Sequence, residues 1–324
     1  MLPQRGVEVK TRGAFHRAPR AARIGATQSA SQAVTIMAGR PTSEIVSRRP
    51  APPLRPFVTW YCGYRDADVG PRRHRGLPSP YLTVIVTLDE PLVVAAHPDL
   101  RIPPAEYGTL VGGLHTTPVL ITHDGRQSGI QLSLSPLGAR ALLGLPAGEL
   151  TGSVLDAADV VGPFANQLRE RVLDAHGWTA RFGVLDEMLS AHLDAGARLQ
   201  GEVVHAWRRL LTSAGAVPAA ELAREVGWSG RYLSRRFGVE VGLSPKAAAR
   251  VVRFDRTRRF LMRQAAEDRG LLLSDVAAEC GYYDQAHLAR EFGEFAGCSP
   301  SRWLGEEFRY VQAGADTLMS DSAT

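Results

Sequence analysis

Cysteine and long apolar runs are scarce in this 324-residue sequence, and each scarcity excludes a class of protein. Only three cysteines occur, Cys62, Cys280 and Cys298, and no two of them have C-x-x-C spacing. A disulfide-stabilised secreted scaffold and a thiolate zinc site are therefore not expected. No run reaches the ~18 to 20 apolar residues of a membrane helix, and the amino terminus lacks the apolar core of a secretory signal. We therefore expect a cytoplasmic protein that does not bind membranes.

Lysine is also scarce, because Lys10 and Lys246 are the only two and arginine carries the remaining basic charge. This charge is unevenly distributed: residues 1–55 and residues 228–263 each carry a formal charge of +8. Since the whole chain has a net charge of +5, the remaining residues sum to −11. A basic block in an otherwise acidic chain is typical of a segment that binds a polyanion, and nucleic acid is the natural candidate.

The length and the hydrophobic fraction of 44% predict a globular chain with two compact domains. Residues 1–53 have the composition of a disordered linker. Short β-branched runs between Gly and Pro breaks predict a β-rich sensor or dimerisation domain, a small sandwich or barrel, over residues 54–150. Amphipathic spacing predicts a helical connector over residues 151–202. A disordered tail is expected over residues 311–324, and the overall fold class is α+β.

One predicted strand shows its two faces clearly. Ile130, Leu132 and Leu134 alternate with Gln131 and Ser133. Because side chains on a strand point alternately to opposite sides, this pattern predicts one buried face and one polar face.

The β-rich region contains few residues that suggest chemistry. Its histidines have no spacing typical of a metal site, so we predict no metal, no cofactor and no catalytic residue. His74 stands among arginines and is interpreted as part of an exposed basic loop. Cys62 stands among aromatic residues and is interpreted as packing, with a reactive sensor thiol as the alternative.

An internal repeat within residues 219–303 is the most informative feature. Residues 222–228 read Leu-Ala-Arg-Glu-Val-Gly-Trp, and residues 276–282 read Val-Ala-Ala-Glu-Cys-Gly-Tyr. Each copy continues with a Leu and a Phe four residues apart and closes with Gly-x-Ser-Pro. The copies match at an offset of 54 residues up to the Gly-aromatic pair and 55 beyond it, so one residue is inserted in the turn.

Each copy has the parts of a helix-turn-helix in the required order. A small residue allows the second helix to cross the first closely, a glycine takes the chain out of the first helix, and a polar residue caps the second. These parts are Ala223 and Ala277 at the crossing, Gly227 and Gly281 at the turn, and Ser229 and Asp284 as caps.

The second helix of each copy, here called the reading helix, is predicted at about residues 230–237 and 285–292. Arginine can bond guanine bidentately, glutamine can pair with adenine, and serine or histidine can reach bases or phosphates. A solvated helix face is the alternative for any one of these side chains, but the repeat and the basic block together favour DNA contact. The predicted contacts are Arg231, Ser234, Arg235, Gln285, His287 and Arg290.

A long helix is predicted between the copies, beginning at Ser244-Pro245 and running to about Met262. Such a helix would hold the reading helices at a fixed separation, as two successive major grooves ~34 Å apart require. Its many arginines predict phosphate contacts and a steep dependence of binding on salt. The predicted phosphate contacts are Arg250, Arg253 and Arg256.

Residues 203–310 resemble the DNA-binding domain of the AraC/XylS-type transcription regulators. The second copy, residues 276–292 followed by Gly-Cys-Ser-Pro at 297–300, is similar to the family signature nearly position by position. The resemblance implies a seven-helix, double helix-turn-helix domain that binds double-stranded DNA, behind an amino-terminal domain that senses an effector or dimerises. A small-molecule effector, a second copy of the chain and, for an activator, RNA polymerase are the further partners that it implies.

Two alternatives to this regulator are weighed. One is an alkyl-transfer enzyme fused to a DNA-binding module, but Cys62 has no neighbouring sequence signature of an activated nucleophile, so we predict no enzyme. The other is an architectural DNA binder without an effector, whose affinity for DNA would not change with any ligand.

Overall fold

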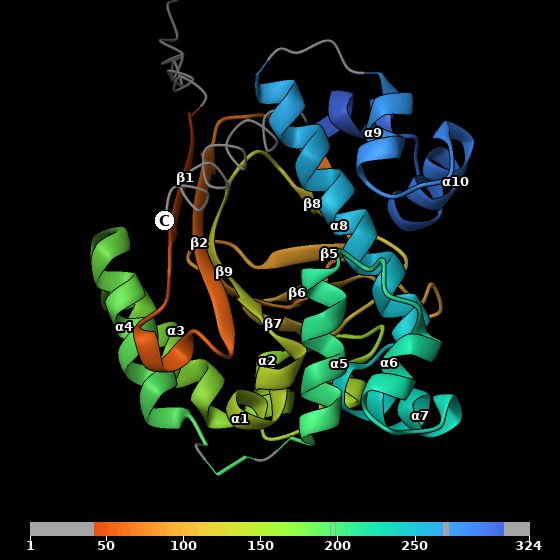
Figure 1. Cartoon of the computed structure of the whole chain (residues 1–324). Coiled ribbons are helices and arrows are strands. Elements are labelled where there is room, and N and C mark those ends of the chain that lie inside the picture. The colour runs from red at the N-terminus through yellow and green to blue at the C-terminus, as the bar shows by residue number, and fades with distance from the viewer. Residues whose placement is uncertain (1–41, 195, 198, 268–271, 308–324) are drawn as a thin grey trace, which may run out of the picture. The chain divides into compact units, whose positions relative to one another are not determined.

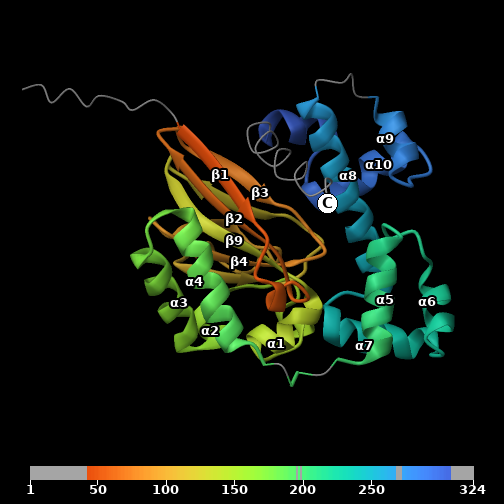
Figure 2. The same ribbon diagram turned by 60° about the vertical axis from the view of Figure 1, so that its left-hand side comes forward.

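The amino-terminal part of the chain forms two antiparallel β-sheets in a computed structural model that describes residues 42–194, 196–197, 199–267 and 272–307 (Figure 2). Sheet A has the strand order β1 (Thr42–Arg48), β2 (Val58–Ala67), β9 (Gln127–Leu134), β4 (Leu82–Thr87), β7 (Thr109–Gly112) and β10 (Val154–Asp156). Sheet B has the order β3 (Arg72–Gly76), β8 (Val119–His123), β5 (Leu92–Ala96) and β6 (Ala105–Tyr107).

The two sheets pack face to face. Ile85 and Leu110 of sheet A lie in one buried apolar cluster with Val94 and Ile121 of sheet B. The region is therefore a sandwich, one of the two forms that the sequence predicts. Burial of apolar side chains between the sheets drives their association.

The other face of sheet A is covered by helices. These are α1 (Ala139–Leu143), α2 (Ala157–Val161), α3 (Pro163–Asp174) and α4 (Gly177–His192), and Figure 2 shows α2–α4 beside the sheet. Ile130, Leu132 and Leu134 of β9 pack in one buried cluster with Leu168 of α3 and Leu185 of α4. The buried face predicted for this strand is confirmed, and the alternation of the strand turns its polar face toward sheet B.

Three strands differ from the sequence predictions. β1 lies inside the segment predicted as linker and pairs along its length with β2. β3 contains His74, so the interpretation of this segment as an exposed loop was wrong. Both are edge strands, where charged residues are common and the hydrophobic pattern is weak. β10 lies in the predicted helical connector and has only three residues, too few to show a period of two.

The carboxy-terminal part is helical. Its elements are α5 (Gly201–Thr212), α6 (Ala219–Glu225), α7 (Gly230–Val241), α8 (Pro245–Ala266), α9 (Leu273–Glu279), α10 (Gln285–Ala296) and a helix at residues 300–307. Figure 1 shows α8 running between α5–α7 and α9–α10. These are the seven helices that the family resemblance implies, and α8 is the predicted long helix between the two copies.

The turns of both copies have the predicted local structure. Gly227 and Gly281 adopt φ of 70° and 76°, a left-handed conformation that glycine tolerates best. The side chain of Ser229 accepts a hydrogen bond from the Tyr232 N–H at 3.2 Å, and that of Asp284 accepts from the His287 N–H at 2.7 Å. Both reading helices are one turn longer than predicted, because the chain leaves each helix only at the following left-handed glycine.

No helix in the described part of the chain is long and apolar enough to cross a membrane. Most of the predicted amino-terminal linker and the whole predicted tail fall in residues 1–41 and 308–324, outside the described residues. The described residues all belong to one compact unit, residues 39–324.

Candidate nucleic-acid interface and internal cavity

The first reading helix, α7, is amphipathic in the way that DNA contact requires. Leu233 and Phe237 are buried at 1% and 0% exposure and anchor its inner side. Arg231, Ser234 and Arg235 are exposed on its outer side. The sequence pattern therefore places these three side chains on the accessible face of the helix.

The second reading helix, α10, has a mixed outer face. Gln285 and Arg290 are exposed, whereas His287 is half-buried. The Nδ1 atom of His287 lies 3.4 Å from the Tyr283 N–H and accepts a hydrogen bond from it. Because one ring nitrogen faces the turn, His287 has less freedom to contact a base than the other predicted readers.

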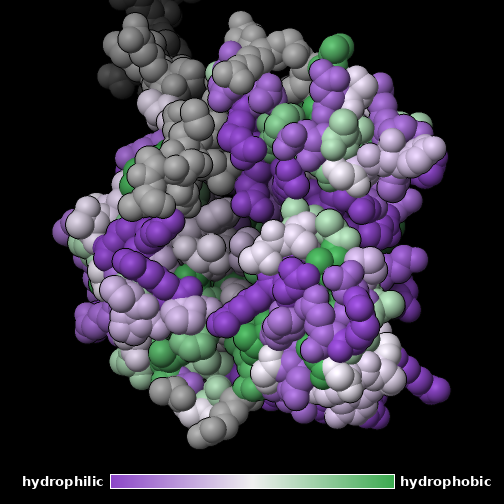
Figure 3. All heavy atoms as spheres, viewed as in Figure 1, coloured by the Kyte–Doolittle hydropathy of each residue, from purple (hydrophilic) through white to green (hydrophobic). Residues whose placement is uncertain are grey.

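Ion pairing separates two kinds of arginine. Among the described residues, Arg231, Arg235 and Arg290 form no ion pair with any carboxylate. The arginines of α8, in contrast, nearly all have acidic partners within the protein. Figure 3 shows hydrophilic residues gathered along α8 on this face of the molecule. The α8 pairs are Arg250–Glu291, Arg250–Glu294, Arg253–Glu291, Arg256–Glu279, Arg258–Asp255 and Arg259–Asp255.

Two of these contacts join α8 to the buried Glu291 of α10. The Nη2 atom of Arg253 lies 2.7 Å from Oε2 of Glu291, and Nε of Arg250 lies 2.8 Å from the same oxygen. Glu291 is 3% exposed. Burial alone would raise its pKa, but hydrogen bonds and positive charge from Arg253 and Arg250 outweigh burial and hold the pKa below its ordinary value. Glu291 is therefore an ionised group that fastens the second reading helix to α8.

The role of Glu291 was missed in the sequence, although a signal exists. Leu288, Glu291, Phe292 and Phe295 follow the i, i+3, i+4, i+7 spacing of one helix face, and all four are buried. A glutamate on the apolar stripe of a helix needs a buried basic partner. Two of the three arginines predicted to contact phosphate, Arg250 and Arg253, bond Glu291, whereas the third, Arg256, bonds the exposed Glu279. Phosphate contact by these three arginines stays a prediction.

The far end of the first reading helix is fixed to the amino-terminal part of the chain. Nε of Arg140, in α1, lies 2.7 Å from Oε2 of the buried Glu240 of α7. The hydroxyl of Thr151 donates a hydrogen bond of 2.8 Å to the carbonyl of Gly242, the left-handed residue that ends α7. These contacts lie at the carboxy-terminal end of α7 and leave the exposed side chains of its first two turns free.

A cavity of about 340 Å³ lies between the two sheets and extends to the helical part of the chain. Its volume is in the range typical of small-molecule sites, ~300 to 1,000 Å³. The polar face of sheet A supplies one wall, with Ser47, Cys62, Tyr64, Thr83, Gln131 and Ser133. The apolar lining comes from both sheets, with Ile85 and Leu110 from sheet A and Leu92, Val94, Val119 and Ile121 from sheet B. The polar side of β9 thus faces an internal space.

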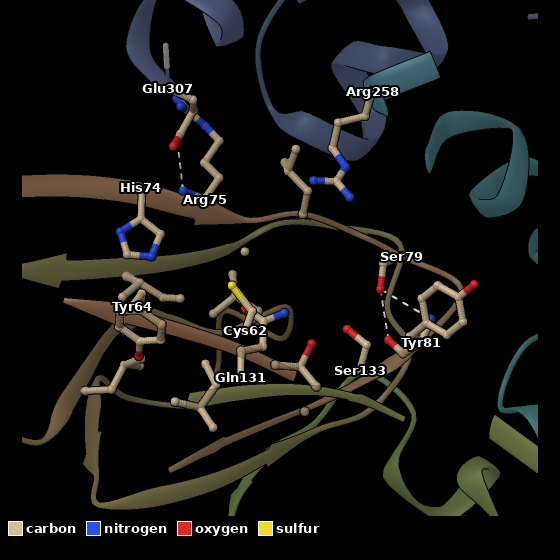
Figure 4. Close-up of a pocket in the computed structure, with 18 of the residues that line it drawn as sticks. Cys62, Tyr64, His74, Arg75, Ser79, Tyr81, Gln131, Ser133, Arg258 and Glu307 are labelled. Atoms are coloured by element: carbon tan, nitrogen blue, oxygen red, sulfur yellow. Dashed lines mark hydrogen bonds between the residues drawn. The ribbon is translucent and has the colours of Figure 1, made fainter. Parts of the chain in front are cut away.

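Helix α8 and the last described helix close this cavity. Their lining residues are Asp255, Arg258, Arg259, Met262, Trp303 and Glu307. In Figure 4, Arg258 and Glu307 lie across the cavity from Cys62, Gln131 and Ser133 of the sheet. Glu307 accepts a hydrogen bond of 3.1 Å from the Arg75 N–H of β3. Side chains from the helix between the two helix-turn-helix units therefore contact the same space as the sandwich interior.

Charged groups of both signs line this end of the cavity, and burial raises the pKa of the Glu307 carboxyl there. Arg258 and Arg259 share the single carboxylate of Asp255, which leaves one formal positive charge in the trio. The Nε atom of Arg258 is buried and has no hydrogen-bond partner among the described residues. His74 also lines the cavity, and burial and the neighbouring His123 lower its pKa to about 4, so His74 is neutral at neutral pH.

Cys62 lines the cavity, and burial raises the pKa of its thiol. An activated nucleophile needs the opposite shift, because the thiolate is the reactive form. The structure therefore gives no support to the alkyl-transfer alternative.

Comparison with known proteins is consistent with the repeat. A family model described as a helix-turn-helix domain matches residues 222–306. A second model, described as a domain of unknown function, matches residues 47–156. A search of curated proteins finds no match to the chain.

Several solved structures are similar to the chain. The C-terminal domain of AraT, a response regulator from Geobacillus stearothermophilus, is 23% identical with a TM-score of 0.29, over 33% of this chain and 86% of that chain. ToxT from Vibrio cholerae is 9% identical with a TM-score of 0.45, over 82% of this chain and 98% of that chain. Wild-type ToxT from strain SCE256 bound to an unsaturated fatty acid is 8% identical with a TM-score of 0.40, over 83% and 96% of the two chains.

The tandem repeat, its two capped reading helices and the matching helix-turn-helix model define a DNA-binding transcription regulator. Within that class, the carboxy-terminal helix-turn-helix domain is of the AraC type. Regulators of this type are not enzymes.

Proposed function

We propose that the protein regulates transcription by inserting α7 and α10 into two successive major grooves on one face of double-stranded DNA. The proposal rests on a difference between two groups of arginines, those that form ion pairs within the protein and those that do not. Arg231, Arg235 and Arg290 are exposed and without ion pairs in the described part of the chain, whereas the arginines of α8 bond carboxylates of the protein. Arginine without an internal partner can bond guanine N7 and O6 at no loss of an existing ion pair.

Methylation interference on duplexes selected from a random-sequence library tests this proposal. We expect N7-methylated guanines to block binding at two clusters about one helical turn apart, 10 to 10.5 base pairs. A single cluster would mean that only one unit enters a groove. Binding without any sequence preference at moderate salt would overturn sequence-specific regulation altogether.

We further propose that a small molecule in the cavity changes the affinity for DNA. The cavity combines an apolar interior with the group of Arg258, Arg259 and Asp255, which together carry one formal positive charge. A ligand with an apolar body and one anionic group fits these surroundings. Such a ligand would contact α8, which carries the second reading helix through Glu291, so occupancy and the placement of α10 are coupled.

Filling the cavity tests the effector proposal. Carboxylic acids of graded chain length serve as probes, and their uncharged primary amides as the matched set. An acid at one hundred times its Kd should stabilise the protein by about 2.7 kcal/mol, and the amide by less. Ser133→Phe should abolish this stabilisation, because Ser133 is buried on the cavity wall, whereas Ser190→Phe on the exposed face of α4 should not. If Ser133→Phe still binds the acid, the ligand site lies outside the cavity. If the affinity for DNA is the same with and without bound acid, the architectural alternative is favoured.

The remaining partners follow from the proposed role. Binding to promoter DNA predicts a cytoplasmic location. A second copy of the chain would allow two sites to be bound together, and RNA polymerase would be contacted if the protein activates transcription. Each of these stays a prediction.

A further inference from the structure

We infer that Tyr232, which meets Trp228 edge-to-face, is a positioning residue that holds the Arg235 guanidinium for base reading. The inference rests on the proposed function and adds a residue that the reading face alone does not reveal. Three side chains, Trp228, Tyr232 and Arg235, contact one another in that order, from the core of the first helix-turn-helix unit to its surface.

The three side chains form a chain of contacts. Trp228 is partly buried and packs against the core of the helical part. Its ring meets the Tyr232 ring edge-to-face, with centroids 4.8 Å apart and an interplanar angle of 85°. The Arg235 guanidinium carbon lies 5.2 Å from the centroid of the Tyr232 ring, within the ~6 Å of a cation–π contact. Tyr232 is 38% exposed, so the stack reaches the surface.

The contact between Tyr232 and Arg235 affects DNA binding because a free arginine side chain loses rotamer freedom when it binds a base edge. Arg235 forms no ion pair among the described residues, so the Tyr232 ring is the contact that restrains its guanidinium. A side chain already held near its bound position loses less freedom on binding, which favours the correct base over others. The ring supplies this restraint through its face, and the phenol hydroxyl is not needed for it.

The second copy provides an internal comparison. Tyr282 and His287 occupy the positions of Trp228 and Tyr232, and their rings also meet edge-to-face, 5.2 Å apart at 83°. There, however, the arginine over the aromatic ring is Arg253 of α8, 4.9 Å from the Tyr282 centroid. Arg290, the equivalent of Arg235, lies over no ring among the described residues. The same aromatic pair thus serves base reading in the first copy and attachment to α8 in the second.

The test compares base preference across a set of variants on duplexes from a random-sequence library. Tyr232→Leu removes the ring face but keeps an apolar side chain of moderate size, and Tyr232→Phe removes only the hydroxyl. We expect Tyr232→Leu to reduce discrimination roughly two- to fivefold, at the same base pair whose preference Arg235→Ala abolishes. Tyr232→Phe should keep the wild-type preference.

The double variant decides between positioning and a merely structural role. In the Arg235→Ala background, Tyr232→Leu should cause no further loss of discrimination, because the side chain that it positions is gone. A loss in that background, or a loss spread evenly over all sequences, would overturn the inference. So would an equal loss in Tyr232→Phe, which would indicate a contact from the hydroxyl. Thermal unfolding of each variant confirms that it is folded.

Failure of this inference is distinguishable from failure of the proposed function. If the wild-type protein shows no base preference, the proposed function fails. If it shows a preference that Tyr232→Leu leaves intact, DNA reading stands and the positioning role of Tyr232 fails.

Discussion

Arg235→Ala is expected to weaken binding to the preferred DNA duplex by about 1 to 3 kcal/mol, and Gln285→Ala by less. Arg235 is exposed, forms no ion pair in the described part of the chain and is held over Tyr232. Gln285 stands at the first residue of α10, where its neutral amide offers weaker hydrogen bonds than a guanidinium. Fluorescence anisotropy with both variants at one fixed salt concentration measures the difference.

Arg208→Ala is the matched control for these measurements. Arg208 is exposed on α5, outside both reading helices, and its loss should change affinity by less than about 0.5 kcal/mol. Equal small losses in Arg235→Ala and Gln285→Ala would overturn the unequal contribution of the two copies. They would leave DNA binding itself intact.

Glu291→Gln is expected to lower the free energy of unfolding by about 3 kcal/mol. The substitution leaves Arg250 and Arg253 without the buried carboxylate that they share. The loss should fall at the lower end of the range for a broken buried ion pair, because the Arg250 side chain is 35% exposed and can be solvated. Urea denaturation measures it.

Glu294→Gln is the matched control on the same helix. Glu294 also pairs with Arg250, but its side chain is 53% exposed, so we expect a loss below about 1 kcal/mol. If the two variants lose stability equally, Glu291 does not fasten α10 to α8.

The dependence on pH provides a second readout for Glu291. Its pKa is lower in the folded protein than in the unfolded chain. Its contribution is therefore fully present above the unfolded value of ~4.3 and is lost as the pH falls through the lower folded value. The difference in stability between the wild type and Glu291→Gln should narrow as the pH is lowered below ~4.

Arg253→Gln separates stability from phosphate contact. Because Arg253 bonds Glu291, we expect lower stability in the variant. If Arg253 also contacts a phosphate as predicted, the slope of log affinity against log salt concentration should fall in magnitude by about 0.9. An unchanged slope would contradict the phosphate contact and leave Arg253 a role in stability alone.

The helix-turn-helix units could be predicted from sequence because their determinants are local. Ser229 and Asp284 cap the residues that follow them, and Gly227 and Gly281 turn the chain where they stand. The copies repeat the same short pattern, so each supports the other. The exposed faces of both reading helices follow directly from the period of the α-helix.

The sandwich could be predicted only as a class. Its edge strands β1 and β3 lack an alternating apolar pattern, and the order of strands in each sheet depends on pairings between distant segments. The cavity could not be predicted either. The polar face of β9 could be predicted, but not what it faces, because sequence does not say what lies opposite a strand.

What the sequence by itself determined is the tandem helix-turn-helix, its caps, its turns and the exposure of Arg231, Arg235 and Arg290. What only the tertiary structure decided is which carboxylates the other arginines bond and that the polar strand face lines a cavity. Arg250 and Arg253 bond Glu291, which lies some 40 residues further along the chain. Arg258 lines the cavity of the sandwich, although all strands of the sandwich precede α8 in the sequence. The ion-pair partner of a charged side chain cannot be identified from the residues around it in the sequence, because it depends on how distant elements pack.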